Sequence, residues 1–247
     1  MAAPVAALYD VHGNLPALEA ALAAANDASA DLVLVGGDVV LGPMPRESLE
    51  RLQALGPRAR FIRGNADRLV VDAFDGGIAT NLPPIVQERI AWCAAQLDRA
   101  HRDFLAALPL TLSVDVDGVG PVLFCHATPR SDDEIVTIRT PDERVGEMLA
   151  GVTEPVVVCG HTHMQFDRTI GSTRLVNAGS VGMPYGSPGA FWLFLGPGVQ
   201  LMRTSYDLAA AAERIRATAF PAASDFAADV ANPASEESIL ALFDARR

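Results

Sequence analysis

The chain has 247 residues, of which half are hydrophobic and a fifth are charged, with 20 glycines and 17 prolines. This composition excludes disordered and collagen-like proteins, and the length allows one large domain or two small ones. The formal net charge of −11 argues against non-specific nucleic-acid binding, because an acidic surface repels the phosphate backbone.

The sequence gives no sign of a membrane or secretory segment. The longest stretch without a charged side chain, residues 175–202, is repeatedly interrupted by glycine and proline and predicts no membrane helix. No basic region or cleavage site precedes Asp10, so we expect a cytosolic protein. Cys93, Cys125 and Cys159 are widely spaced, and we expect free buried thiols.

The first part of the chain alternates predicted strands with predicted helices. Helical patterns follow Asn14 over residues 15–25 and begin at Pro45 over residues 45–55. This β-α-β-α order favours a parallel sheet. Short apolar runs predict buried strands at residues 4–9, 32–35, 61–62, 122–125, 156–159, 174–176, 191–195 and 200–202.

Residues 67–109 break this rhythm and predict a small helical insertion, or cap, with helical stretches at 85–97 and 101–108. From Thr111 the pattern is rich in strands, and a helical tail occupies residues 208–247. No linker separates these parts, so we expect one α/β domain over residues 1–247, built from two packed sheets flanked by helices.

Polar side chains that can bind metals follow directly on several predicted strands. In an α/β sheet, ligand sites gather at the carboxyl ends of the strands. Residues two apart at a strand end project to the same side, so each Asp-x-His or His-x-His pair can bind one cation. The motifs are Asp10-Val11-His12, Gly37-Asp38, Gly64-Asn65, His126 and Gly160-His161-Thr162-His163.

Together these residues offer two carboxylates, one amide oxygen and four imidazoles. This donor set suits Mn, Fe, Co, Ni or Zn. Each motif alone is common in ordinary turns, and histidines also occur as satisfied core residues. However, four of the five histidines of the chain lie in these motifs, which favours a metal site over scattered structural roles.

The order of these motifs resembles the calcineurin-like metallophosphoesterase superfamily, and within it the small bacterial and archaeal phosphodiesterases. Residues 10–15, 37–43 and 177–182 match the motifs of this subgroup, and the resemblance covers residues 5 to about 195. It implies a four-layer α/β/β/α sandwich of two mixed sheets with two divalent ions. One ion would be bound by Asp10, His12, Asp38 and His163, and the other by Asp38, Asn65, His126 and His161, with Asp38 bridging the two.

The implied activity is hydrolysis of phosphoester bonds by a metal-bridging hydroxide, with Asp38, Asn65 and His126 as catalytic residues. Two divalent ions in such a site activate water and neutralise charge on the phosphoryl group. Many relatives have a histidine at the position of Ala66, where it protonates the leaving group. The absence of this histidine favours, as substrates, phosphodiesters with activated leaving groups or nucleotide-type phosphoanhydrides.

Two alternatives remain open, namely a phosphomonoesterase or phosphoprotein phosphatase, and a non-catalytic scaffold with the same fold. For substrate binding we expect contributions from Asn14, which precedes a helix, from Arg130 in the loop after His126, and from Tyr185. The expected partner is a small phosphorylated molecule, for which a nucleotide is one candidate.

Overall fold

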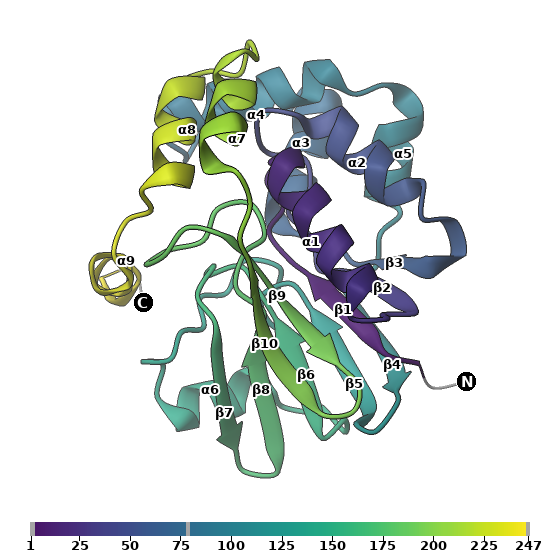
Figure 1. The fold of residues 1–247 in the computed structure, drawn as a ribbon. Coiled ribbons are helices and arrows are strands. Elements are labelled where there is room, and N and C mark those ends of the chain that lie inside the picture. Colours follow the sequence, from purple (N-terminus) through teal and green to yellow (C-terminus); the bar gives the residue numbers. More distant parts are fainter. Residues whose placement is uncertain (1–2, 78–79, 246–247) are drawn as a thin grey trace.

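The computed structural model describes residues 3–77 and 80–245 and contains two mixed five-stranded sheets (Figure 1). The first sheet has the order β10-β9-β1-β2-β3 and the second has the order β4-β5-β6-β8-β7. The first comprises β1 (Val5–Leu8), β2 (Leu32–Val35), β3 (Ala59–Phe61), β9 (Ala190–Leu195) and β10 (Val199–Thr204). The second comprises β4 (Thr111–Val116), β5 (Gly120–Cys125), β6 (Val156–Cys159), β7 (Phe166–Ile170) and β8 (Thr173–Asn177).

The sheets pack face to face because both faces of their central strands are apolar. Along β1, Leu8 faces the helices, whereas Val5 and Ala7 face the second sheet. Along β5, Phe124 belongs to the core between the sheets and Leu123 to the outer core. Side chains alternate across a strand, so a continuous apolar run fills two cores at once.

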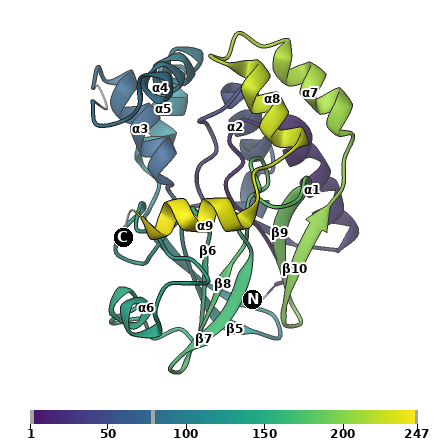
Figure 2. The ribbon, with the colours of Figure 1, turned by 90° about the vertical axis from the view of Figure 1, so that its left-hand side faces the viewer.

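Helices cover the outer faces of both sheets, which completes the expected α/β/β/α arrangement (Figures 1 and 2). The Asn14 side chain accepts a hydrogen bond from the Ala17 N–H and so starts the first helix. The core on the outer face of the first sheet includes side chains of α1 (Leu15–Asp27), α2 (Pro45–Gln53), α3 (Asn65–Phe74), α4 (Pro84–Gln96), α5 (Arg99–Ala106), α7 (Leu208–Arg216) and α8 (Ala223–Ala231). On the second sheet lies α6 (Asp142–Met148), and α9 (Glu236–Asp244) ends the described chain.

The structure differs from the sequence-based expectations in detail. The helices of the expected insertion begin at Asn65 rather than Asp67, and neither β7 nor α6 was expected. Cys93, Cys125 and Cys159 are buried and free. None of the helices within residues 3–77 and 80–245 has the length and apolarity needed to cross a bilayer.

Candidate metal centre

The seven predicted ligands converge where the parallel strands of both sheets end. Asp10 and His12 follow β1, Asp38 follows β2, and Asn65 begins α3 after β3. His126 follows β5, and His161 and His163 follow β6. Six of the seven fall into two groups whose candidate ligand atoms lie within 4.8 Å of one another: Asp10, His12 and His163, and Asp38, His126 and His161.

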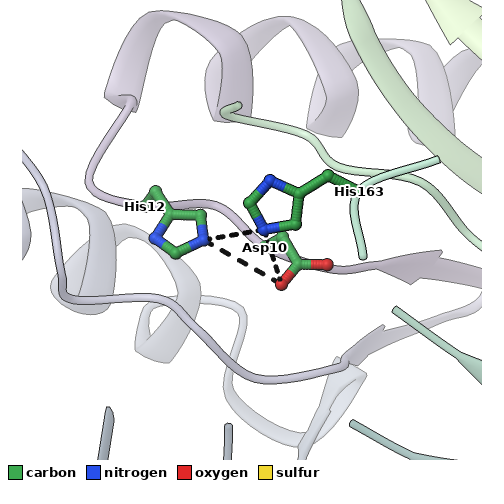
Figure 3. A group of neighbouring side chains, drawn as sticks. All are labelled: Asp10, His12 and His163. Atoms are coloured by element: carbon green, nitrogen blue, oxygen red, sulfur yellow. Dashed lines mark hydrogen bonds and ion pairs between the residues drawn. The ribbon is translucent and has the colours of Figure 1, made fainter. Parts of the chain in front are cut away.

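In the first group, three side chains point toward one another from distant parts of the chain (Figure 3). The Nε2 atoms of His12 and His163 are 3.1 Å apart. Oδ1 of Asp10 lies 3.4 Å from Nε2 of His163 and 4.0 Å from Nε2 of His12. Metal–ligand bonds of about 2.0–2.2 Å in a tetrahedral site place ligand atoms about 3.3–3.6 Å apart, so this spacing fits one cation.

The second group surrounds the carboxylate of Asp38. Its Oδ2 lies 3.4 Å from Nε2 of His126. The Oδ1 atom of Asn65, the seventh predicted ligand, lies 3.1 Å from the same imidazole nitrogen. The ring of His161 packs edge-on against that of His126, with ring centroids 5.2 Å apart. Carboxylate, amide and imidazole donors therefore face a common point.

Asp38 also faces the first group, since its Oδ2 lies 3.7 Å from Nε2 of His12. Conversely, Oδ1 of Asp10 lies 3.8 Å from Nε2 of His126. The two groups are thus adjacent, and one carboxylate oxygen lies between imidazoles of both. This arrangement matches a pair of sites that share a ligand.

The ligand side chains are held by hydrogen bonds through their other polar atoms. Oδ2 of Asp10 accepts a hydrogen bond from the His161 N–H at 2.9 Å, and Oδ1 of Asp38 accepts one from the Ala66 N–H at 2.8 Å. A carbonyl can only accept, so in each of the following contacts Nδ1 carries a proton and Nε2 is the ring atom that can bind a cation. The Nδ1 atoms of His12, His126 and His163 donate to the carbonyls of Leu41, Gly36 and Met183 at 3.1, 2.8 and 2.7 Å.

One buried oxygen of the site has no hydrogen-bond donor. Oδ1 of Asp10 is fully buried, and within the described residues it makes no hydrogen bond. A buried carboxylate oxygen without a hydrogen bond costs considerable free energy unless a nearby positive charge compensates it. The donor set and this oxygen therefore fit bound divalent metal ions.

The backbone at the site is strained. Among the described residues, seven non-glycine residues have positive φ, and five of these are predicted ligands. The left-handed conformation costs about 1–2 kcal/mol for an ordinary residue. Such strain concentrates where the rest of the fold fixes a functional geometry. The five φ values are 54° for Asp10, 46° for His12, 55° for Asp38, 65° for His161 and 59° for His163.

Two glycines of the sequence motifs leave room for the carboxylates. A Cβ atom at Gly64 would lie 2.1 Å from Oδ1 of Asp38, and one at Gly160 would lie 2.6 Å from Oδ2 of Asp10. Either contact is too short for a side chain. Glycine is therefore required at both positions, because the backbone there lies directly against the carboxylates of Asp38 and Asp10.

Comparison with known proteins identifies the family. A model of the calcineurin-like phosphoesterase superfamily domain matches residues 4–195. The chain belongs to the calcineurin-like phosphoesterase superfamily. The resemblance expected from the motifs is thereby confirmed, and so is the fold.

Relatives of this phosphoesterase domain match over most of the chain. An uncharacterized protein of Methanocaldococcus jannaschii is 26% identical over 238 residues, covering 85% of this chain and 91% of that protein. The crystal structure of a hypothetical protein from Pyrococcus horikoshii superposes with a TM-score of 0.80 at 20% identity, covering 95% and 100% of the two chains. That of a metallophosphoesterase from Sphaerobacter thermophilus superposes with a TM-score of 0.70 at 25% identity, covering 93% and 98%.

The charged groups of the candidate metal centre shift one another's pKa values. Burial lowers the pKa of His126, but the carboxylate of Asp38 outweighs this effect and raises the pKa to about 10. Burial raises the pKa of Asp38, but His126 outweighs it and brings the pKa below its usual value. Burial, and then the charge of His126, lower the pKa of His161 to about 4.

The side chains expected to contact substrate have other partners. The amide of Asn14 caps α1 and donates to the carbonyl of Gly182 at 2.9 Å. The ring of Tyr185 stacks on that of His163, with centroids 5.5 Å apart. Arg130 is half exposed and forms an ion pair with Glu134 at 2.6 Å, so binding of substrate by Arg130 would require release of this carboxylate.

Sequence reasoning gave no role to Asp67, which the structure places beneath the site. Its carboxylate is fully buried and accepts hydrogen bonds from the N–H groups of Asp38 and Val39, both at 2.8 Å. Burial, and then the charge of Asp38, raise the pKa of Asp67 to about 6. The only signal was its place in Gly64-Asn65-Ala66-Asp67.

Proposed function

We propose that this protein is a metal-dependent phosphoesterase that hydrolyses phosphoester bonds with two divalent cations. The observation that carries the proposal is the adjacency of two ligand groups with one oxygen of Asp38 between them. Membership of the phosphoesterase superfamily supports it. Asp10, His12, Asp38 and His163 would hold one cation, and Asp38, Asn65, His126 and His161 the other.

Two bound divalent cations lower the pKa of a water molecule and neutralise charge on phosphoryl oxygens. The chain itself positions the side chains that would hold the cations. Backbone N–H groups fix one oxygen of Asp10 and one of Asp38, so their other oxygens keep a set direction. Backbone carbonyls do the same for three of the imidazoles. A site held this firmly needs little rearrangement during the reaction.

The chain lacks a proton donor at the position where many relatives carry a histidine. Ala66 is 2% exposed and lies at the start of α3 beside Asn65. General acid catalysis is commonly worth about 10²- to 10⁴-fold. The lack of a general acid slows hydrolysis least when the leaving group departs as a stable anion. The proposed substrates are therefore phosphodiesters with activated leaving groups, or nucleotide-type anhydrides, rather than alkyl phosphomonoesters.

The test is hydrolysis of a matched panel by metal-stripped protein refilled with Mn, Ni, Zn or Mg. The panel comprises an aryl phosphodiester, an aryl phosphomonoester, a dinucleoside polyphosphate and a phosphopeptide. We expect metal-dependent turnover that is fastest on the diester or the anhydride. A preference for the phosphopeptide would contradict the substrate class, and absence of turnover with every metal would contradict the activity.

A further inference from the structure

A large cavity opens beside the second ligand group. Its volume is about 910 Å³, and its lining includes both Asn65 and His161. It extends away from the metal centre between α3, α4 and α9. Cavities of about 300–1,000 Å³ are the size that proteins use for small organic ligands. A substrate phosphoryl group at the metal centre would therefore have space for its organic group on this side.

Apolar side chains form part of the cavity wall, beside polar and charged ones. Leu69 lies about one helical turn beyond Asn65 on α3, and Ile90 of α4 is buried behind it. Ile135, from the loop after β5, and Phe243 of α9 also line the cavity. These four apolar side chains can bind a planar ring through burial and aromatic contact.

The position of α9 is fixed by contacts at several points. Figure 2 shows this helix lying across the molecule between α3 and the strands of the second sheet. Leu240 is buried at 7% exposure, and Arg139 forms ion pairs with Glu237 and Asp244, near the two ends of the helix. Phe243 is thus held at the cavity, although it lies beyond residue 195, where the family match ends.

Among its described residues, the rim of the cavity offers no unpaired cation for additional phosphate groups. Among the described lining residues, Arg68 is the only cationic side chain. Its Nε and one Nη both donate to the buried carboxylate of Asp132, at 2.9 Å each. Asp72 and Asp133 also line the cavity and are exposed. This charge distribution disfavours a polyphosphate and favours an organic group that carries no further negative charge.

We infer that this cavity binds a planar, uncharged ring system attached to a single phosphoryl group, and that Phe243 determines specificity for it. The inference rests on the proposed function and narrows its substrates to phosphodiesters with a ring-bearing organic group. Phe243 acts on binding of that group and has no part in the chemical step.

The test measures binding of two non-hydrolysable probes to the full-length, Mn-loaded protein by calorimetry. Methylphosphonate occupies only the metal centre, whereas naphthylmethylphosphonate carries the same anionic group and a double ring. We expect the ring-bearing probe to bind about tenfold more tightly than methylphosphonate, from aromatic contact and burial. In Phe243→Ala this preference should fall to about twofold, with the methylphosphonate affinity unchanged.

Leu242→Ala is the matched control, since Leu242 is adjacent on the same helix and 56% exposed. This variant should retain the full preference for the ring. Equal affinity of the two probes, or an unchanged preference in Phe243→Ala, would overturn the inference while leaving the metal centre in place. Failure of methylphosphonate itself to bind would overturn the proposed metal centre and this inference with it.

Discussion

The buried carboxylate of Asp67 accepts a 2.8 Å hydrogen bond from the backbone N–H of Asp38. It also accepts hydrogen bonds from the N–H groups of Val39, Val40 and Gly64. One carboxylate therefore holds together the loop after β2 and the start of α3. These two segments carry Asp38 and Asn65, so Asp67 fixes the relative position of two proposed ligands.

Asp67→Asn should lower the free energy of unfolding of the metal-free protein by about 1–3 kcal/mol. The amide NH₂ group would replace one carboxylate oxygen, and the backbone N–H groups that donate to this oxygen would lose their acceptor. Urea unfolding at about pH 8, where the carboxylate is ionised, measures this change. Asp72→Asn is the control, since Asp72 lies on the same helix but is exposed. Equal unfolding free energies for the two variants would contradict the structural role of Asp67.

Metal binding should release protons at neutral pH. The pKa of His126 is raised to about 10 in the metal-free protein, so its ring carries a proton that a cation must displace. The pKa of His161 is lowered to about 4, so His161 contributes no proton. The affinity for Mn²⁺ should therefore rise between about pH 6 and pH 8, by about tenfold per pH unit for each proton released.

Calorimetric titration in two buffers with different ionisation enthalpies measures the number of protons released. We expect the release of at least one proton per chain near pH 7. An affinity that does not change with pH, together with identical heats in both buffers, would show that His126 is already neutral.

Asp132 should stabilise the fold through its ion pairs with Arg63 and Arg68, at 3.2 and 2.9 Å. Burial raises its pKa, but Arg68 outweighs this effect and holds the pKa below its usual value. The stabilisation is present above the unfolded pKa of about 3.9 and is lost as the pH falls through the lower folded value. Asp132→Asn should therefore lower the unfolding free energy by about 1–2 kcal/mol near pH 7, and by less below about pH 4.

The control for this prediction is Asp133→Asn, because the side chain of Asp133 is 62% exposed. This variant should change the unfolding free energy by less than about 0.5 kcal/mol. A loss in Asp132→Asn that persists undiminished at about pH 3 would show that the effect is not electrostatic.

The main elements of the fold were predictable because central strands and amphipathic helices leave strong local patterns. The runs at Val122–Cys125 and Val156–Cys159 are apolar on both faces, as strands buried between two layers must be. β7 was missed because this edge strand buries only Phe166 and Ile170, so its pattern is weak. α6 was missed because it has only seven residues.

The grouping of the seven candidate ligands was predictable because each lies within a few residues of the end of an apolar run. The interaction partners of Arg130 and Asp67 depend on tertiary contacts and could not be predicted from the local sequence. The ion pair between Arg130 and Glu134 and the hydrogen bonds of Asp67 join residues whose types allow many partners. Phe243 reaches the cavity through the packing of a helix far along the chain.

The number of Mn²⁺ ions bound per chain tests the central claim most directly. Metal-stripped protein is loaded with Mn²⁺, freed of excess metal and assayed for metal content, in parallel with Asp38→Asn. We expect two ions in the unmodified protein and at most one in Asp38→Asn, because the oxygen between the two groups loses its charge. No retained metal in the unmodified protein, or two ions in Asp38→Asn, would contradict the proposed shared-ligand centre.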